Sequence, residues 1–501
     1  MNRDRGVKNL FYSILGQVVT IGIGLLLPRF FILGYGSEVN GLLNSVNQIF
    51  SYFILLEAGI GAASLQALYR PVADGDGASI CRIMAATKRY YDRASVFYLV
   101  GIALFAGIYT YFMAGEVPVP EMIGVIVFSG LGNVLNFRYQ GKYKILLQAE
   151  GKKYIISNVQ TLAQVLISLA KLIGVWLGLP IVTVMGLGFA ASLVQTLYYI
   201  WYIQKHYQWL NLSAEPDWKA VEQKNSVLVH QVSQLIFQNT DVLILTIVCG
   251  LKVVSVYSVY KMVVSAISQL TYQFSESFLF ILGQEYGRNR KRYEEYLDCF
   301  DVIYTAASFL LLTVTYLLYP SFIDLYTNGV RDVSYGGQWL PLLFVGIELL
   351  SSCRRAAQNT IDVAGHFRKT ASRSAAEAAI NLAVSLALVG IWGIYGVLLG
   401  TVAALLYRTN DMIWYVSKKL LKRSTWRFYR VYLVNFAVFF LAAAAGTVWP
   451  VAAAGWSGFL GFGAALTIGM GVVYGGVSML CFPAVRKRVK ETMAGMRKDL
   501  R

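Results

Sequence analysis

The sequence predicts an all-α membrane protein that crosses the bilayer many times. Of its 501 residues, 56% are hydrophobic and 14% are charged, whereas soluble domains are about 25% charged. Apolar runs of the ~20 residues that a membrane helix needs recur along the whole chain. A transmembrane β-barrel would instead show alternating segments of about ten residues, and this pattern is absent from the sequence.

The apolar runs predict about fourteen transmembrane helices. We expect them at residues 9–34, 39–68, 94–114, 121–141, 154–177, 182–204, 225–249, 253–284, 300–319, 339–363, 374–391, 395–416, 431–449 and 457–482. The long first, second, eighth and tenth segments must tilt or kink, or project from the membrane.

These spans predict two six-helix lobes and an accessory pair. The expected divisions are an N-terminal lobe (1–204), a cytoplasmic linker (205–224), a C-terminal lobe (225–416), and accessory helices 13 and 14 with a basic cytoplasmic tail (417–501). The accessory pair is rich in Ala and Gly and has no charge within either span, so we expect it outside any polar pathway.

The distribution of Lys and Arg predicts the orientation in the cytoplasmic membrane. With the N-terminus inside, 35 of the 44 Lys and Arg residues lie in inner connections, and only Lys252 and Arg331 lie in outer ones. Both termini are therefore expected in the cytoplasm. The net charge of +17 is explained by the Lys and Arg residues of the inner connections, which set the topology and attract anionic membrane lipids. We therefore expect no nucleic-acid partner.

Cysteine and histidine spacing gives no sign of a metal or redox site. The five Cys and three His residues are scattered without paired spacing. No nucleophile-and-base motif and no phosphate-binding glycine loop is present. The sequence therefore predicts no catalytic residues, no metal and no cofactor.

Several ionisable residues fall deep within the predicted spans, where a charge is costly and is usually functional. The cations are Arg29, Lys171, Lys261, Arg354 and Arg355, and the carboxylates are Glu57, Asp241 and Glu348. The cations suit an anionic cargo, because guanidinium groups bind phosphate oxygens bidentately. The carboxylates are expected to balance charge or to bind a coupling Na⁺ or H⁺. The alternatives are ion pairs that only orient helices and, for Arg29 near the outer end of its span, an interfacial anchor or a partner of Glu38.

Two further sets of polar residues can be explained by a structural role as well as by a functional one. The seventh span carries His230, Gln231, Gln234 and Gln238 on one face with Asp241, suited either to sugar hydroxyls or to pairing across helices. Another set lies near inner span ends, where ordinary interfacial roles are expected: Arg138, Glu276, Glu377, Arg408 and Asp411.

The first 90 residues carry a family resemblance. They contain Pro-Arg-Phe-Phe-Ile from Pro28, Tyr-Gly-Ser-Glu-Val-Asn-Gly-Leu from Tyr35, Leu-Leu-Glu-Ala-Gly-Ile-Gly from Leu55 and Leu-Tyr-Arg-Pro-Val-Ala from Leu68. Together these segments resemble the polysaccharide-export branch of the multidrug/oligosaccharidyl-lipid/polysaccharide (MOP) transporter superfamily. The resemblance implies a flippase for lipid-linked oligosaccharide units of capsule, O-antigen or related glycans.

We therefore expect a transporter rather than an enzyme. It would move an undecaprenyl-pyrophosphate-linked oligosaccharide by alternating access of two lobes around a cationic central cavity. Its expected partners are that anionic lipid, membrane lipids and other polysaccharide assembly proteins. The alternatives are a cation-coupled multidrug exporter of the same superfamily and, from another class, a membrane glycan polymerase or ligase.

Overall fold

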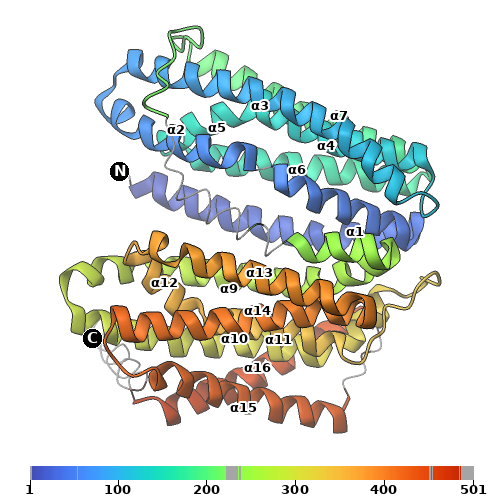
Figure 1. The fold of residues 1–501 in the computed structure, drawn as a ribbon, viewed down its shortest axis with the longest axis vertical. Helices are drawn as coiled ribbons and strands as arrows, with labels where there is room; N and C mark the ends of the chain where they lie inside the picture. The colour runs from blue at the N-terminus through green and yellow to red at the C-terminus, as the bar shows by residue number, and fades with distance from the viewer. Residues whose placement is uncertain are drawn as a thin grey trace. The chain divides into compact units, whose positions relative to one another are not determined.

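Long α-helices make up the chain in the computed structural model (Figure 1). The structure describes residues 3–53, 55–221, 235, 239–450, 453, 455–483 and 486, without the side chains of 3–15, 17, 55–59, 62, 280, 281, 367 and 368. Within these residues ten helices are long and apolar enough to cross a membrane. Between Ala114 and Val117 an isolated bridge forms, and no named strand occurs in the described part. The predicted all-α, multi-pass membrane fold is confirmed.

Within the described part of the chain, four of the fourteen predicted spans have no candidate helix of their own. One helix, Val18–Phe53, runs through the first predicted span and into the second. The seventh predicted span falls partly outside the described residues, and its described part includes the shorter helix Asn239–Cys249. The tenth is broken into two short helices at Arg354. The twelfth remains one helix, Ile394–Tyr415, whose apolar character Arg408 and Asp411 interrupt.

The chain divides into two compact units. Unit 1 is Met1–Ser258 with Val330–Val333, and unit 2 is Val259–Gly329 with Ser334–Arg501. The division falls inside one long helix, α9 (Leu251–Arg288), whereas the sequence places the lobe boundary in the linker 205–224.

The remaining elements are as follows. In unit 1 they are α1 (Arg3–Phe53), α2 (Leu55–Asp74), α3 (Gly77–Phe112), α4 (Val119–Leu135), the π-helix η1 (Asn136–Gln140), α5 (Gly141–Ala149), α6 (Lys153–Trp176) and α7 (Ile181–His206). In unit 2 they are α10 (Arg290–Tyr326), α11 (Leu340–Cys353), α12 (Arg355–Val363), α13 (Phe367–Trp392), α14 (Ile394–Tyr415), the π-helix η2 (Val416–Leu420), α15 (Trp426–Val448) and α16 (Gly455–Cys481).

A glycine breaks α1 where the sequence predicts a turn between the first two spans. Gly36 has φ 85° and ψ 172°, a conformation that is strained for residues with a side chain. Asp332 satisfies the groups exposed by this break. Its Oδ2 accepts the backbone N–H of Ser37 at 2.7 Å, and its Oδ1 accepts the Ser37 hydroxyl at 2.9 Å. The break is therefore capped like a helix N-terminus.

The linker that follows α7 packs against the start of α3. The backbone N–H of Asn211 donates to Sγ of Cys81 at 3.2 Å, and the Trp209 ring lies close to Gly77. Asp76 caps the start of α3, and its side chain accepts the N–H of Ser79 at 3.0 Å. Hydrogen bonds from Ser79 lower the pKa of Asp76 below its usual value.

The junction of η1 and α5 depends on a close contact with α3. A Cβ built on Gly141 would lie 2.6 Å from Cε1 of Tyr91, and Tyr91 is fully buried. We expect Gly141→Ala to lower the free energy of unfolding by about 1–3 kcal/mol, because the tyrosine has no space to move. Thermal unfolding of the purified protein in detergent measures this. The matched substitution Gly132→Ala, where nothing lies within 4 Å of a Cβ, should leave the midpoint unchanged; equal effects would contradict the packing argument.

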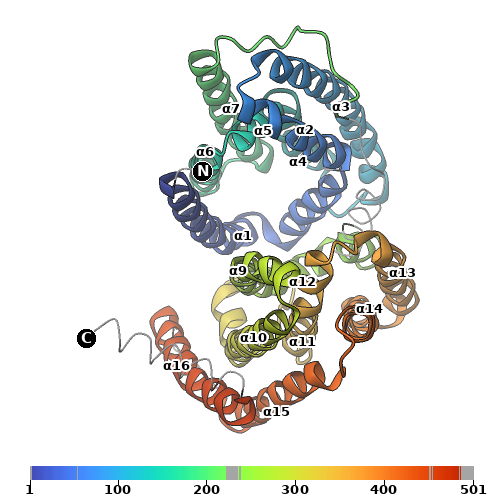
Figure 2. The same cartoon turned by 90° about the vertical axis from the view of Figure 1, so that its left-hand side faces the viewer.

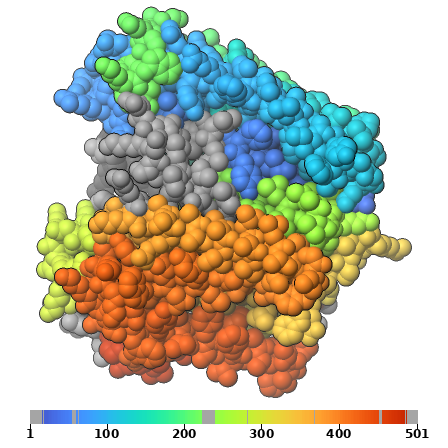
Figure 3. Space-filling model, viewed as in Figure 1, coloured from blue at the N-terminus to red at the C-terminus, as the bar shows by residue number. Residues whose placement is uncertain are grey.

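In unit 2 the accessory helices α15 and α16 both pack against α10. Figure 2 shows the pair at one edge of unit 2. Figure 3 draws all atoms in the orientation of Figure 1, and on this face of unit 2 the side chains fill the spaces between neighbouring helices. The accessory pair thus adds a layer to unit 2 beside α10.

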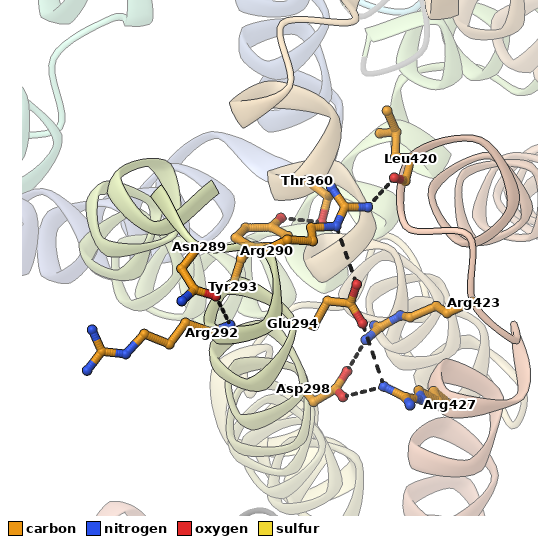
Figure 4. Close-up of polar contacts among 10 residues, drawn as sticks. All are labelled: Asn289, Arg290, Arg292, Tyr293, Glu294, Asp298, Thr360, Leu420, Arg423 and Arg427. Atoms are coloured by element: carbon orange, nitrogen blue, oxygen red, sulfur yellow. Dashed lines mark hydrogen bonds and ion pairs between the residues drawn. The ribbon is translucent and has the colours of Figure 1, made fainter. Parts of the chain in front are cut away.

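Ion pairs join the start of α10 to the segment between α14 and α15 and to the first turn of α15 (Figure 4). Asp298 lies 2.6 Å from Nη1 of Arg423 and 3.3 Å from Nη1 of Arg427. Glu294 pairs with Arg290 at 3.3 Å, and Arg290 also donates to the carbonyl of Leu420. The Arg423 side chain is 6% exposed. Asp298 therefore balances a buried charge.

Removing that carboxylate should destabilise unit 2. We expect Asp298→Ala to lower the free energy of unfolding by roughly 1–3 kcal/mol, since it leaves the buried guanidinium of Arg423 without its acceptor. Thermal unfolding in detergent micelles measures the loss. The control is Asp74→Ala, which removes an exposed ion pair with Arg70 and should have no measurable effect. A negligible effect of both substitutions would contradict the prediction.

Candidate functional site

Five ion-paired side chains form a chain of alternating charge inside unit 2. Arg354 pairs with Glu377, whose second carboxylate oxygen lies 3.5 Å from Nε of Arg408. Nη1 of Arg408 lies 2.8 Å from Asp411, which also pairs with Arg373. We call these five residues the arginine network. Three guanidinium groups against two carboxylates leave it with one net positive charge.

Close packing of two helices builds this network. Arg373 and Glu377 lie on α13, and Arg408 and Asp411 lie on α14. The two helices approach closely at Gly400, where a Cβ would lie 2.1 Å from Oγ of Ser385. Such small residues allow membrane helices to come together. The approach brings Glu377 of α13 within reach of Arg408 on α14.

Burial is greatest at the centre of the arginine network and falls toward its ends. The side chain of Arg408 is 1% exposed and that of Glu377 9%, whereas the terminal Arg354 and Arg373 are 21% and 28% exposed. A buried cation is stable only when it is paired. The carboxylates are thus committed to Arg408, and the excess positive charge resides at the two partly exposed ends.

Arg354 links the network to a second polar cluster. It lies at the break between α11 and α12, beside Arg355. On α11, Glu348 accepts a hydrogen bond from the Ser268 hydroxyl of α9 at 2.5 Å. The positive charges that act on Glu348 are those of Lys261, Arg354 and Arg355. The structure therefore brings three of the five predicted cations and one predicted carboxylate into one part of unit 2.

Arg355 has an aromatic partner. Its guanidinium carbon lies 4.9 Å from the centre of the Tyr272 ring, within the range of a cation–π interaction. Its buried Nε has no hydrogen-bond acceptor among the described residues. This guanidinium keeps donor capacity that an anionic ligand can use.

The remaining predicted residues that the structure describes lie in unit 1. Arg29 is half-buried on α1, directly after Pro28. Lys171 lies on α6, and its Cε would be 2.6 Å from a Cβ on Gly188, so its stem packs against α7. Asp241 is 3% exposed and accepts the hydroxyl of Tyr257 at 3.0 Å. This carboxylate is hydrogen-bonded within unit 1.

Part of the predicted site falls outside the described residues. This applies to the polar face of the seventh span and to one side chain of α2: His230, Gln231, Gln234, Gln238 and the side chain of Glu57. Within the part that the structure describes, no group of three or more His, Cys, Asp and Glu residues is placed to hold a metal ion.

Sequence reasoning assigned ordinary interfacial roles to three members of the arginine network, Glu377, Arg408 and Asp411. The structure instead buries Arg408 between the two carboxylates. The spacing of Arg408 and Asp411, three residues apart on one helix, is a signal that would have indicated a pair. Nothing in the sequence indicates that Glu377 joins Arg354, because that contact depends on how two helices are rotated.

Comparison with solved structures identifies the fold. The chain is similar to an inward-facing multidrug-resistance MATE-family transporter of the MOP superfamily, with TM-score 0.63 and 14% identity over 81% of this chain and 96% of that one. It is also similar to the lipid II flippase MurJ in an inward closed conformation, with TM-score 0.60 and 13% identity over 94% and 98%. No protein-family model and no curated protein matches the sequence.

A third similar structure is a MOP superfamily transporter from Pyrococcus furiosus, described as having a binding pocket of reverse polarity that suggests a different function. Its TM-score is 0.54 at 14% identity, over 83% of this chain and 96% of that one. The structural neighbours are thus MOP superfamily transporters and flippases, not enzymes. At these identities the likeness establishes the fold, and the cargo has to be argued from this chain's own residues.

Proposed function

We propose that the protein is a flippase for lipid-linked oligosaccharide repeat units. It would carry an undecaprenyl-pyrophosphate-linked glycan from the inner to the outer leaflet of the cytoplasmic membrane, by alternating access of its two lobes. The observation that carries the proposal is the positive excess around Arg354 and Arg355, next to Lys261. Arginines at depth in a membrane protein suit a pyrophosphate, whose oxygens accept bidentate hydrogen bonds.

The carboxylates predicted at depth have a second role in the proposal. Glu348 and Asp241 would bind the coupling Na⁺ or H⁺. An ion on Glu348 would act directly on the cations proposed to bind the cargo, because they lie around that carboxylate. A cation bound there would change the charge that the cargo meets. The coupling ion would then alter cargo affinity by electrostatics alone.

The alternative within the same fold is a cation-coupled multidrug exporter, since several of the similar structures are MATE transporters. A cationic drug needs a site with negative excess, and the arginine network has the opposite sign. A drug-resistance profile of a strain lacking the protein distinguishes the two candidates.

The decisive experiment measures lipid-linked intermediates in a strain lacking the protein, with surface glycan assayed beside them. The proposal requires complete lipid-linked units to accumulate on the cytoplasmic leaflet while surface polymer is lost. Single units that reach the outer leaflet unpolymerised would indicate a polymerase or ligase instead. An unchanged pool with increased drug sensitivity would indicate the drug exporter.

A further inference from the structure

Two cations are less than 5% exposed in the part of the chain that the structure describes, and they differ in their partners. Arg408 is 1% exposed and lies between two carboxylates. Lys142, on α5 in unit 1, is 4% exposed, and its Nζ donates to the backbone carbonyl of Arg138 at 2.7 Å. No carboxylate of a described residue lies within 4 Å of that Nζ. Lys142 is thus a buried cation that forms no ion pair with any residue that the structure describes.

The local fold holds Lys142 in this position. It follows the π-helix η1, and π-helical turns are frequent at functional sites. Gln140 anchors the turn to α7 through a buried hydrogen bond to Thr196 at 2.8 Å. Gly141 lets the chain approach Tyr91 of α3. Contacts on both sides therefore fix the helix face that carries Lys142.

More positive charge surrounds this lysine. The charged groups that act on Lys142 are two cations, Lys88 and Arg138, and one anion, Asp92. Lys144 follows Lys142 by two residues on α5 and donates to the side-chain oxygen of Asn136 at 2.6 Å. We call Lys88, Arg138, Lys142 and Lys144 the η1 cation cluster. The cluster draws its four cations from α3, η1 and α5, and among the described residues Asp92 is the one carboxylate that acts on Lys142.

Aromatic rings accompany the cations. The Nζ of Lys142 lies 5.2 Å from the ring centre of Tyr143, and that of Lys144 lies 5.6 Å from the ring centre of Tyr199. The guanidinium of Arg138 lies 5.9 Å from the ring centre of the exposed Tyr139. These rings stabilise the cations without neutralising them. The positive charge of the cluster remains available to an anion.

Membrane topology alone does not explain this arrangement. Cations that orient a membrane protein only need to lie in the inner connections, where water solvates them. Burying a lysine without a carboxylate costs several kcal/mol and adds nothing to topology. A persistent buried charge of this kind is typical of a functional site.

We propose that the η1 cation cluster binds a phosphate-bearing headgroup, with exposed Arg138 making the contact and buried Lys142 supplying charge at low dielectric. The assignment of the cargo pyrophosphate as that headgroup rests on the proposed function. Anionic phospholipid offers the same chemistry. The site lies at the end of unit 1 that the distribution of Lys and Arg assigns to the cytoplasm, where a cytoplasmic pyrophosphate is first met.

The test uses the purified full-length protein in detergent, with inorganic pyrophosphate as the probe. Titrations followed by thermal unfolding compare the wild type with Lys142→Met, and sulfate at equal ionic strength measures non-specific effects. We expect the apparent Kd for pyrophosphate to rise about tenfold in Lys142→Met, because one positive charge near the ligand is lost at low dielectric. The matched control is Lys153→Met, which removes an exposed lysine from α6 and should change the Kd less than twofold.

A second variant keeps the test decisive if Lys142→Met fails to fold. Arg138→Gln changes an exposed side chain and should weaken pyrophosphate binding to a similar extent, while Lys142→Arg should retain most of it. Wild-type affinity in Arg138→Gln, or in a folded Lys142→Met, would overturn the proposal. So would a wild-type response to pyrophosphate no larger than the response to sulfate.

The source of the headgroup is decided by repeating the titration in lipid nanodiscs. If the site serves the cargo, pyrophosphate affinity should be equal in phosphatidylcholine and in a 3:1 mixture with phosphatidylglycerol. Loss of affinity in the mixture would assign the site to anionic phospholipid. These results are independent of the deletion strain: an unchanged intermediate pool would remove the cargo assignment but leave the binding site, and normal binding by Lys142→Met would remove the site but leave the flippase.

Discussion

Replacing Arg354 or Arg355 by Ala is expected to abolish glycan export while leaving a folded protein in the membrane. Each substitution removes a guanidinium group that would contact phosphate. Such a charge-assisted contact contributes about 1.5–3 kcal/mol, or roughly a 10- to 100-fold change in cargo affinity. In Arg354→Ala the carboxylate of Glu377 keeps Arg408 as its partner, so the arginine network should survive.

Surface glycan, with membrane-inserted protein quantified in parallel, measures the effect. The matched control is Arg290→Ala, which removes a partly exposed, ion-paired arginine of unit 2 outside the network and should leave export normal. Arg355→Lys retains the charge but loses the planar group over Tyr272, so export should fall only in part. Normal export by both alanine variants would exclude these arginines from cargo binding.

The sequence predicts the fold well because each membrane helix can be recognised from its own apolar run. An apolar run of about twenty residues forms a helix in lipid, because its backbone groups have no water to bond. This holds for each run whatever its neighbours are. The same reasoning placed a turn near Gly36, and the structure has its break there. The helices within a span are less visible. The tenth span becomes polar at Arg354 and Arg355, but this change does not show that the helix breaks there.

Side-chain partners were predicted less well because they depend on helix rotation. Lys261, Glu348, Arg354 and Arg355 were identified from their depth, and they do fall in one region of unit 2. The position of a charged residue near the end of a span does not show whether its side chain is solvated or buried. The sequence therefore indicates that Lys142 is an ordinary cation of an inner connection. In the structure, the π-turn before it and the close contact of Gly141 with Tyr91 bury it.

Removing the central carboxylate of the arginine network should cause the largest loss of stability. Glu377→Ala leaves the buried Arg408 with only Asp411 and deprives Arg354 of its partner. Breaking a buried ion pair from one side costs about 3–5 kcal/mol, because the remaining charge stays desolvated. We expect a loss of this size in the free energy of unfolding in detergent, and a smaller one for Glu377→Asp, which retains the charge on a shorter side chain.

The double variant Glu377→Leu/Arg408→Met separates stability from transport. Replacing both partners with apolar groups of similar size removes the buried charges together, so stability should return to within about 1 kcal/mol of the wild type. Asp411 would retain Arg373 as its partner. If the network serves only to hold α13 and α14 together, export should recover with stability. If Glu377 positions Arg354 for the cargo, export should remain lost in a stable protein, and this is the outcome we expect.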